Sequence, residues 1–100
     1  MTFVAKVSDV PAGGKKLFVV DGQEVLLINH KGTIHAVESE CPHQGAPLAS
    51  VSMVKEDYLS CQRHGYRFKL HDGSCKEHPE CTLKIYPVRI ENNEVLVDLE

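Results

Sequence analysis

The chain has 100 residues, of which 42% are hydrophobic and 25% charged, and its formal net charge is −3 at pH 7. This length suits one domain, and this composition is typical of a folded globular protein, neither disordered nor fibrous. A negative chain would be repelled by a phosphate backbone, so nucleic acid is not expected as a partner. We therefore predict a single domain over residues 1–100.

The amino terminus and the longest apolar run both bear on location. Lys6 and the pair Ser8-Asp9 interrupt the stretch where a secretion signal would need an apolar core. The longest aliphatic run, Val25 to Ile28, is far shorter than the roughly 18 residues of a membrane span. We expect a soluble, cytoplasmic protein with no membrane contact. In that compartment thiols are kept reduced, so the four cysteines indicate metal binding more than disulfides.

Three strands are the first elements predicted along the chain. Residues 17–20 and 25–28 are apolar runs joined by Asp21-Gly22, a pair that accepts the positive φ of a hairpin turn. A third strand, residues 33–37, follows the Lys31-Gly32 turn.

Residues 41–80 have a different character. They hold most of the prolines and several glycines, with brief strand candidates only near residues 52–54 and 57–60. Loops with so little apolar periodicity need a source of order besides burial, and a bound metal centre would supply it. We predict a loop-rich, cluster-binding subdomain inserted in a β scaffold.

The last predicted element is a hairpin of residues 84–90 and 95–99 around Asn92-Asn93. No segment shows the sustained apolar period of a long helix, and β-branched residues gather in short runs between turn residues. The sequence therefore predicts an all-β fold, a small sandwich or partly open barrel.

Two short motifs within residues 41–80 each pair a cysteine with a histidine. They are Cys41-x-His43 and Cys61-x-x-His64. Thiolate and imidazole can bind zinc or iron, but a zinc finger usually takes two ligands of one kind from each arm. One cysteine and one histidine in each arm would suit a two-iron cluster, with the cysteines on one iron and the histidines on the other. Neutral imidazoles remove two negative charges, which raises the potential to about −150 to +300 mV.

The flanking residues extend this pattern. Cys-Pro-His-Gln-Gly-Ala-Pro-Leu (41–48), His-Gly-Tyr-Arg-Phe (64–68), Asp-Gly-Ser-Cys (72–75) and Tyr-Pro-Val-Arg (86–89) resemble the Rieske [2Fe–2S] proteins over nearly the whole chain. The resemblance implies one Rieske-type [2Fe–2S] cluster with Cys41, His43, Cys61 and His64 as its metal ligands. It also implies an electron carrier, with no catalytic residue of its own.

Two departures narrow the subfamily. Respiratory Rieske proteins carry a disulfide between the ligand loops, but the corresponding positions here are Ala46 and Arg63. They also carry a serine after the second His-Gly, where this chain has Tyr66. Without that hydroxyl on a cluster sulfur, the potential is expected at the low end of the range. The chain thus resembles the ferredoxins of bacterial ring-hydroxylating oxygenase systems, which act in aromatic hydrocarbon catabolism.

By this resemblance, a flavin-containing NAD(P)H-dependent reductase loads the cluster and a terminal oxygenase receives the electron. We expect a monomer whose ligand histidines stand at an exposed tip, so that the potential falls as pH rises through their ionisation. The glycines of the ligand loops suit close approach of backbone amides to the cluster sulfurs. The predicted docking surface is small and weakly charged, and comprises Pro42, Gln44, Gly45, Pro47, Gln62, Arg63, Gly65 and Tyr66.

Other candidate residues are interpreted as structural. Cys75 and Cys81 are expected to be packed or free thiols, with a mutual disulfide as the next reading, and Tyr66 and Phe68 are expected to pack under the metal loops. The remaining histidines are not expected to bind metal, and the acidic residues around the insertion are read as solvated surface. These histidines are His30, His35, His71 and His78, and these acidic residues are Glu38, Glu40, Glu56, Asp57, Glu77 and Glu80.

Three other functions are alternatives to an electron-carrying ferredoxin. The Rieske-like small subunit of an assimilatory nitrite reductase has a similar fold, but many such subunits lack the four ligands present here. A complete Rieske oxygenase would need a second domain with a mononuclear iron held by two histidines and a carboxylate. A structural zinc module would be colourless. The sequence does not identify the oxygenase, the reductase or the substrate.

Overall fold

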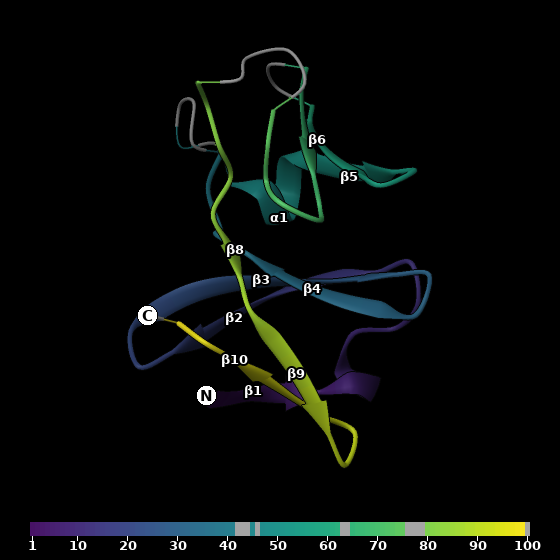
Figure 1. Ribbon diagram of the computed structural model, residues 1–100, viewed down its shortest axis with the longest axis vertical. Helices are drawn as coiled ribbons and strands as arrows, with labels where there is room; N and C mark the ends of the chain where they lie inside the picture. Colours follow the sequence, from purple (N-terminus) through teal and green to yellow (C-terminus); the bar gives the residue numbers. More distant parts are fainter. Residues whose placement is uncertain (42–44, 46, 63–64, 76–79, 100) are drawn as a thin grey trace.

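The computed structural model describes residues 1–41, 45, 47–62, 65–75 and 80–99, and arranges them in three antiparallel sheets stacked along the long axis (Figure 1). The lower sheet is β1 (Thr2–Lys6), β10 (Glu94–Val97) and β9 (Val88–Glu91). The middle sheet is β2 (Lys15–Val20), β3 (Gln23–His30), β4 (Thr33–Val37) and β8 (Ile85–Tyr86). The upper sheet is β5 (Ser52–Lys55), β6 (Tyr58–Cys61) and β7 (Tyr66–Lys69). The all-β prediction is confirmed, and the sheets stay open without closing into a barrel.

The hairpin turns follow from residues that tolerate positive φ. Asp21 and Gly22 have φ of 52° and 79° between β2 and β3, and Lys31 and Gly32 have 54° and 84° between β3 and β4. Asn92 and Asn93 have 52° and 64° between β9 and β10. Two successive positive φ values define the turn whose twist matches a two-residue hairpin. All three predicted turns are confirmed.

Strand β3 divides the interior into two cores. Successive side chains of a strand point to opposite faces, so Leu26 and Ile28 enter one core while Val25 and Leu27 enter the other. The lower core comprises Ala5, Val10, Val25, Leu27, Ile34, Ala36, Tyr86, Val95 and Val97. The upper core comprises Leu26, Ile28, Val37, Cys41, Leu48, Leu59, Cys61, Phe68, Leu70, Cys75 and Leu83. The middle sheet is therefore covered on both faces.

Several elements were not predicted from the sequence. Strands β1 and β7 are additional, and so are two short helices of about one turn each, η1 (Val7–Asp9) and α1 (Leu48–Val51). The predicted strand over residues 84–90 is divided at Pro87, which has no N–H to donate, into β8 and β9 of two different sheets. No helix in the described ranges has the length and apolarity needed to cross a membrane.

Candidate metal centre

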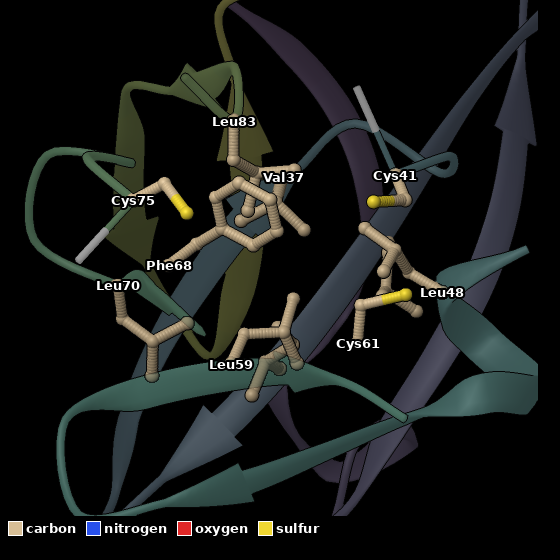
Figure 2. Close-up of a cluster of buried hydrophobic side chains, with 11 residues drawn as sticks. Val37, Cys41, Leu48, Leu59, Cys61, Phe68, Leu70, Cys75 and Leu83 are labelled. Carbon is tan, nitrogen blue, oxygen red and sulfur yellow. The ribbon is translucent and has the colours of Figure 1, made fainter. Parts of the chain in front are cut away.

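Cys41 and Cys61 lie in the same core although nineteen residues separate them in the chain. Both are buried, with 1% and 0% of their surface exposed. Cys41 follows β4 and its connection, and Cys61 ends β6. Figure 2 shows both side chains on one side of the Phe68 ring, next to Leu48. The fold thus brings together the two predicted thiolate ligands.

The two ligand loops close with the same turn. The N–H of Gly45 donates to the carbonyl of Cys41 at 2.7 Å, and the N–H of Gly65 donates to the carbonyl of Cys61 at 2.7 Å. Both glycines have φ of 73°, a conformation that L side chains rarely adopt. These two amides therefore close the turns. The expected bonds from loop amides to cluster sulfurs stay a prediction for the other amides.

Hydrogen-bonded pairing of the backbone joins the two ends of each ligand loop. Glu40 forms an antiparallel bridge with Pro47, and the N–H of Leu48 donates to the carbonyl of Ser39 at 2.9 Å. Cys61 pairs directly with Tyr66 at the end of the β6–β7 hairpin. Each loop therefore leaves and re-enters the fold at one fixed point.

Part of the predicted site lies outside the described residues. This applies to the ligands His43 and His64 and to Pro42, Gln44 and Arg63 of the docking surface. The four described loop residues are all exposed, namely Gly45, Pro47, Gln62 and Gly65. The cysteine thiols are thus buried beneath a rim of exposed loop residues. That arrangement fits a cofactor covered by protein on one side and open to a partner on the other.

The aromatic residues after the second loop pack as predicted. Phe68 is fully buried in the upper core, and the partly buried Tyr66 ring lies 6.5 Å from it between centroids, tilted by 60°. Burial, and then the neighbouring Cys81 and Cys75 thiols, raise the pKa of the Tyr66 hydroxyl. Tyr66 therefore lies beside Cys61 as an aromatic residue whose hydroxyl is uncharged at neutral pH.

A cavity of about 560 Å³ lies away from the ligand loops, between the β3–β4 hairpin and the β5–β6 turn. His30, His35, Asp57 and His71 line it, and His30 Nε2 is 3.4 Å from Asp57 Oδ1. Burial, and then the neighbouring His30, lower the pKa of His35, while its hydrogen bond to the Leu70 backbone opposes the shift. Across the described residues no three His, Cys, Asp or Glu side chains are arranged to hold a metal ion.

The remaining sequence candidates have structural surroundings. Cys75 is buried and Cys81 is partly buried against the upper core, and the structure has no disulfide between them. Glu38 is partly buried: its Oε2 accepts the N–H of Lys84 at 2.7 Å, and burial raises the pKa of this carboxyl. His78 and Glu77 lie outside the part of the chain that the structure describes.

Comparison with known families decides the chemistry of this site. The model of the Rieske [2Fe-2S] domain matches residues 1–87. The chain belongs to the Rieske family. It carries one Rieske-type [2Fe–2S] cluster, and two buried thiols on two matched loops fit that group, because thiolates are the usual ligands of iron–sulfur clusters. When bound, the cluster supplies one-electron redox chemistry.

Two curated relatives are ferredoxins. The biphenyl dioxygenase ferredoxin subunit of Pseudomonas sp. (strain KKS102) is 35% identical over 98% of this chain and 93% of the relative. The ferredoxin component of the alkene monooxygenase system of Xanthobacter autotrophicus (strain ATCC BAA-1158 / Py2) is 31% identical over 97% of this chain and 80% of the relative. Both relatives are electron-carrying components of oxygenase systems, and the Rieske cluster of this chain supplies the same one-electron chemistry.

Solved structures share its fold. The ferredoxin of carbazole 1,9a-dioxygenase from Nocardioides aromaticivorans IC177 superposes with a TM-score of 0.86 at 25% identity, covering 100% of both chains. A nitrite reductase small subunit from Mycobacterium tuberculosis gives a TM-score of 0.85 at 24% identity, over 96% of this chain and 91% of that one. The second likeness concerns the fold alone.

Proposed function

We propose that this Rieske protein is the ferredoxin component of an oxygenase system, with Cys41 and Cys61 on one iron and His43 and His64 on the other. The observation that carries this assignment is the placement of the two thiols, each buried at the start of a loop closed by the same glycine turn. Each histidine motif follows its cysteine within the same loop. Both loops therefore present one thiolate and one imidazole to a single cofactor.

The exposed rim supports transfer to a partner. Gly45 and Pro47 of the first loop and Gln62 and Gly65 of the second are exposed and uncharged. A small, weakly charged contact suits a transient redox complex, which must release its partner after each electron. The docking surface of our proposal includes these four residues together with Pro42, Gln44, Arg63 and Tyr66.

The oxygenase systems to which the relatives belong support our choice of redox partners. Their oxygenases act on an alkene and on biphenyl, and we propose a hydrocarbon oxygenase, expected to be ring-hydroxylating, as the electron acceptor. A flavin-containing NAD(P)H-dependent reductase is the proposed donor. We further propose that the chain works as a monomer in the cytoplasm, where the NAD(P)H that such a reductase consumes is available.

The cluster environment bears on the potential. Neither Ala46 nor Arg63 can contribute a sulfur to a bridge between the ligand loops, and Tyr66 replaces the serine of respiratory Rieske proteins. Fewer stabilising hydrogen bonds on cluster sulfurs leave the reduced state less favoured. We propose a potential in the lower part of the range of about −150 to +300 mV.

Ligand replacement tests the assignment. The reduced holoprotein should give the low average g value of mixed histidine and cysteine ligation in low-temperature EPR. In His43→Cys and His64→Cys, an added thiolate charge should lower the potential toward the roughly −400 mV of all-cysteine clusters. Cys75→Ser is the matched control and should keep the wild-type spectrum. Unchanged spectra in both histidine variants, or a colourless protein containing zinc, would contradict the assignment.

Partner specificity tests the functional class. Under anaerobic conditions, NADH and a flavoprotein reductase from a biphenyl dioxygenase system should bleach the visible absorption of the oxidised cluster. The rate of bleaching should be at least as fast as turnover of the complete oxygenase system. Reoxidation on adding the corresponding terminal oxygenase completes the electron path. If nitrite reductase flavoprotein accepts or donates the electron and the oxygenase components do not, the alternative small-subunit function replaces the proposal.

A further inference from the structure

The backbone pairing next to Cys75 and Cys81, extended by one residue, brings these two cysteines opposite each other. Ser74 and Thr82 form an antiparallel bridge, and the N–H of Leu83 donates to the carbonyl of Gly73 at 2.8 Å. Both contacts belong to one antiparallel register. One step further along that register, the partner of Cys75 is Cys81.

The spacing of such a pair suits a disulfide. Directly opposite residues of antiparallel strands have Cα atoms about 4.5 to 5.5 Å apart. A disulfide requires Cα atoms about 4.4 to 6.8 Å apart. The two backbones are held tightly here, because a Cβ added to Gly73 would overlap the carbonyl of Leu83. The register therefore cannot slip without disrupting this contact.

Burial places both thiols on the same face. Side chains directly opposite each other in an antiparallel pair project to one side. Cys75 is 3% exposed and belongs to the upper core, where Figure 2 shows its sulfur turned toward Phe68. Cys81 is partly buried and packs against the same core. Burial, and then the neighbouring Cys75, raise the pKa of the Cys81 thiol, which agrees with two adjacent thiols.

The pair is separate from the proposed cluster ligands. In Figure 2 the Phe68 ring lies between Cys75 on one side and Cys41 and Cys61 on the other. Phe68 is fully buried, so its ring is a fixed element of the core. Oxidation of Cys75 and Cys81 therefore need not involve a sulfur that binds iron.

We propose that Cys75 and Cys81 form a reversible dithiol site that small-molecule disulfides, such as glutathione disulfide, oxidise to an intramolecular bond. The more exposed Cys81 thiolate attacks one sulfur of glutathione disulfide, forming a mixed disulfide and releasing one glutathione. The Cys75 thiolate then attacks Cys81 Sγ and releases the second glutathione. Two protein thiols are oxidised, one glutathione disulfide is reduced, and the two thiol protons end on the two glutathiones. This site goes beyond electron carriage by the cluster.

Peptide mapping of the oxidised holoprotein tests this proposal. The holoprotein is incubated with glutathione disulfide, blocked with N-ethylmaleimide and digested with trypsin without reductant. Cleavage after Lys69, Lys76 and Lys84 puts the two cysteines in different peptides, 70–76 and 77–84. We expect these two peptides to be disulfide-linked, with cluster iron unchanged, and dithiothreitol to separate them. The reaction should be faster at higher pH, because the attacking species is the thiolate.

Single variants distinguish an internal bond from surface modification. In Cys75→Ser, Cys81 has no thiol partner and should accumulate as a stable glutathione adduct, whereas the wild type should not. Cys81→Ser should form no linked peptide. A wild-type protein that keeps both thiols, or stops at the glutathione adduct, would overturn the proposal, and so would a bond to Cys41 or Cys61.

Discussion

The two halves of this molecule are held together in different ways. The base, made of the lower and middle sheets, has strands of up to eight residues, and β3 alone supplies side chains to two cores. The upper sheet has three strands of four residues each. Its buried residues pack on the middle sheet through Leu26, Ile28 and Val37. The cluster-binding subdomain therefore shares its core with the middle sheet, whereas the lower core contains none of its residues.

This difference separates stability from function. The base has a buried core of its own but contributes no proposed ligand. The subdomain contributes all four proposed ligands and uses short hairpins and glycine turns to place them. A metal centre that joins two loops adds binding free energy to folding free energy. We therefore expect changes in the subdomain to alter the cluster first, and changes in the base to alter global unfolding first.

The largest effect is expected from loss of a cysteine ligand. Cys61→Ala removes a thiolate that no neighbour can replace in the same geometry, so cluster incorporation should fall to background. The base should stay folded, as judged by the circular dichroism of its strands. Iron analysis and visible absorption check the first statement. A Cys61→Ala protein that retains two irons would remove Cys61 from the ligand set.

Truncation of the two cores should give effects of similar size but different kind. Phe68→Ala in the upper core should lower the free energy of unfolding by about 3 to 5 kcal/mol, and Leu27→Ala in the lower core should lower it by about 2 to 5 kcal/mol. In Phe68→Ala, cluster bleaching on heating should precede loss of strand signal. In Leu27→Ala, bleaching and unfolding should coincide. If the temperatures of cluster bleaching and of strand unfolding differ by the same amount in both variants, the proposed difference between the subdomain and the base is wrong.

Glycine turns offer a matched pair of smaller changes. Gly65 and Gly22 have φ of 73° and 79°, and a Cβ at either one would meet no neighbouring atom. Alanine should therefore cost only the left-handed backbone penalty, about 1 to 2 kcal/mol, at each position. Gly65→Ala should also lower cluster occupancy or shift its potential, whereas Gly22→Ala should leave both unchanged. Urea titration measures the free energy of unfolding, and redox titration measures the potential of the cluster.

The smallest effect concerns pH and the cavity between the sheets. Because burial, His30 and His71 lower the pKa of His35 in the folded chain, the unfolded chain binds more protons below about pH 6.5. Stability should be complete above that pH and decline as pH falls toward the lowered pKa, with Asp57 opposing the shift. His35→Gln should flatten this decline, and the exposed His71→Gln should change it less. Equal slopes for wild type and His35→Gln would exclude the effect.

The sequence predicted the base better than the subdomain, and the reasons are physical. Turn pairs such as Asp21-Gly22 specify their own backbone conformation, and the apolar runs around them leave one pairing. Strand β7 was not predicted because the alternation of Tyr66 and Phe68 with Arg67 and Lys69 covers only four residues, directly after a ligand motif. The apolar run around Pro87 predicts a single strand. Because proline has no N–H to donate, the strand is interrupted there and the chain passes from one sheet to another.

The site shows the same contrast. The two Cys/His motifs predict Cys41 and Cys61 as ligands of one cluster, and the structure places both side chains in the upper core. The ligand set itself stays a prediction. The bridge between Glu40 and Pro47 and the matching turns at Gly45 and Gly65 depend on backbone geometry, which residue types alone do not encode. The proximity of Cys75 to Cys81 depends likewise on strand register.

Hydrogen exchange of the holoprotein and of the chelated, cluster-free protein tests the central comparison most directly. Removal of the cluster should increase exchange in the ligand loops and in β5, β6 and β7, while amides of β2, β3 and β4 keep their protection. That result would show that the cluster organises the subdomain on a self-sufficient base. Equal loss of protection in both halves, or no change in the ligand loops, would contradict it.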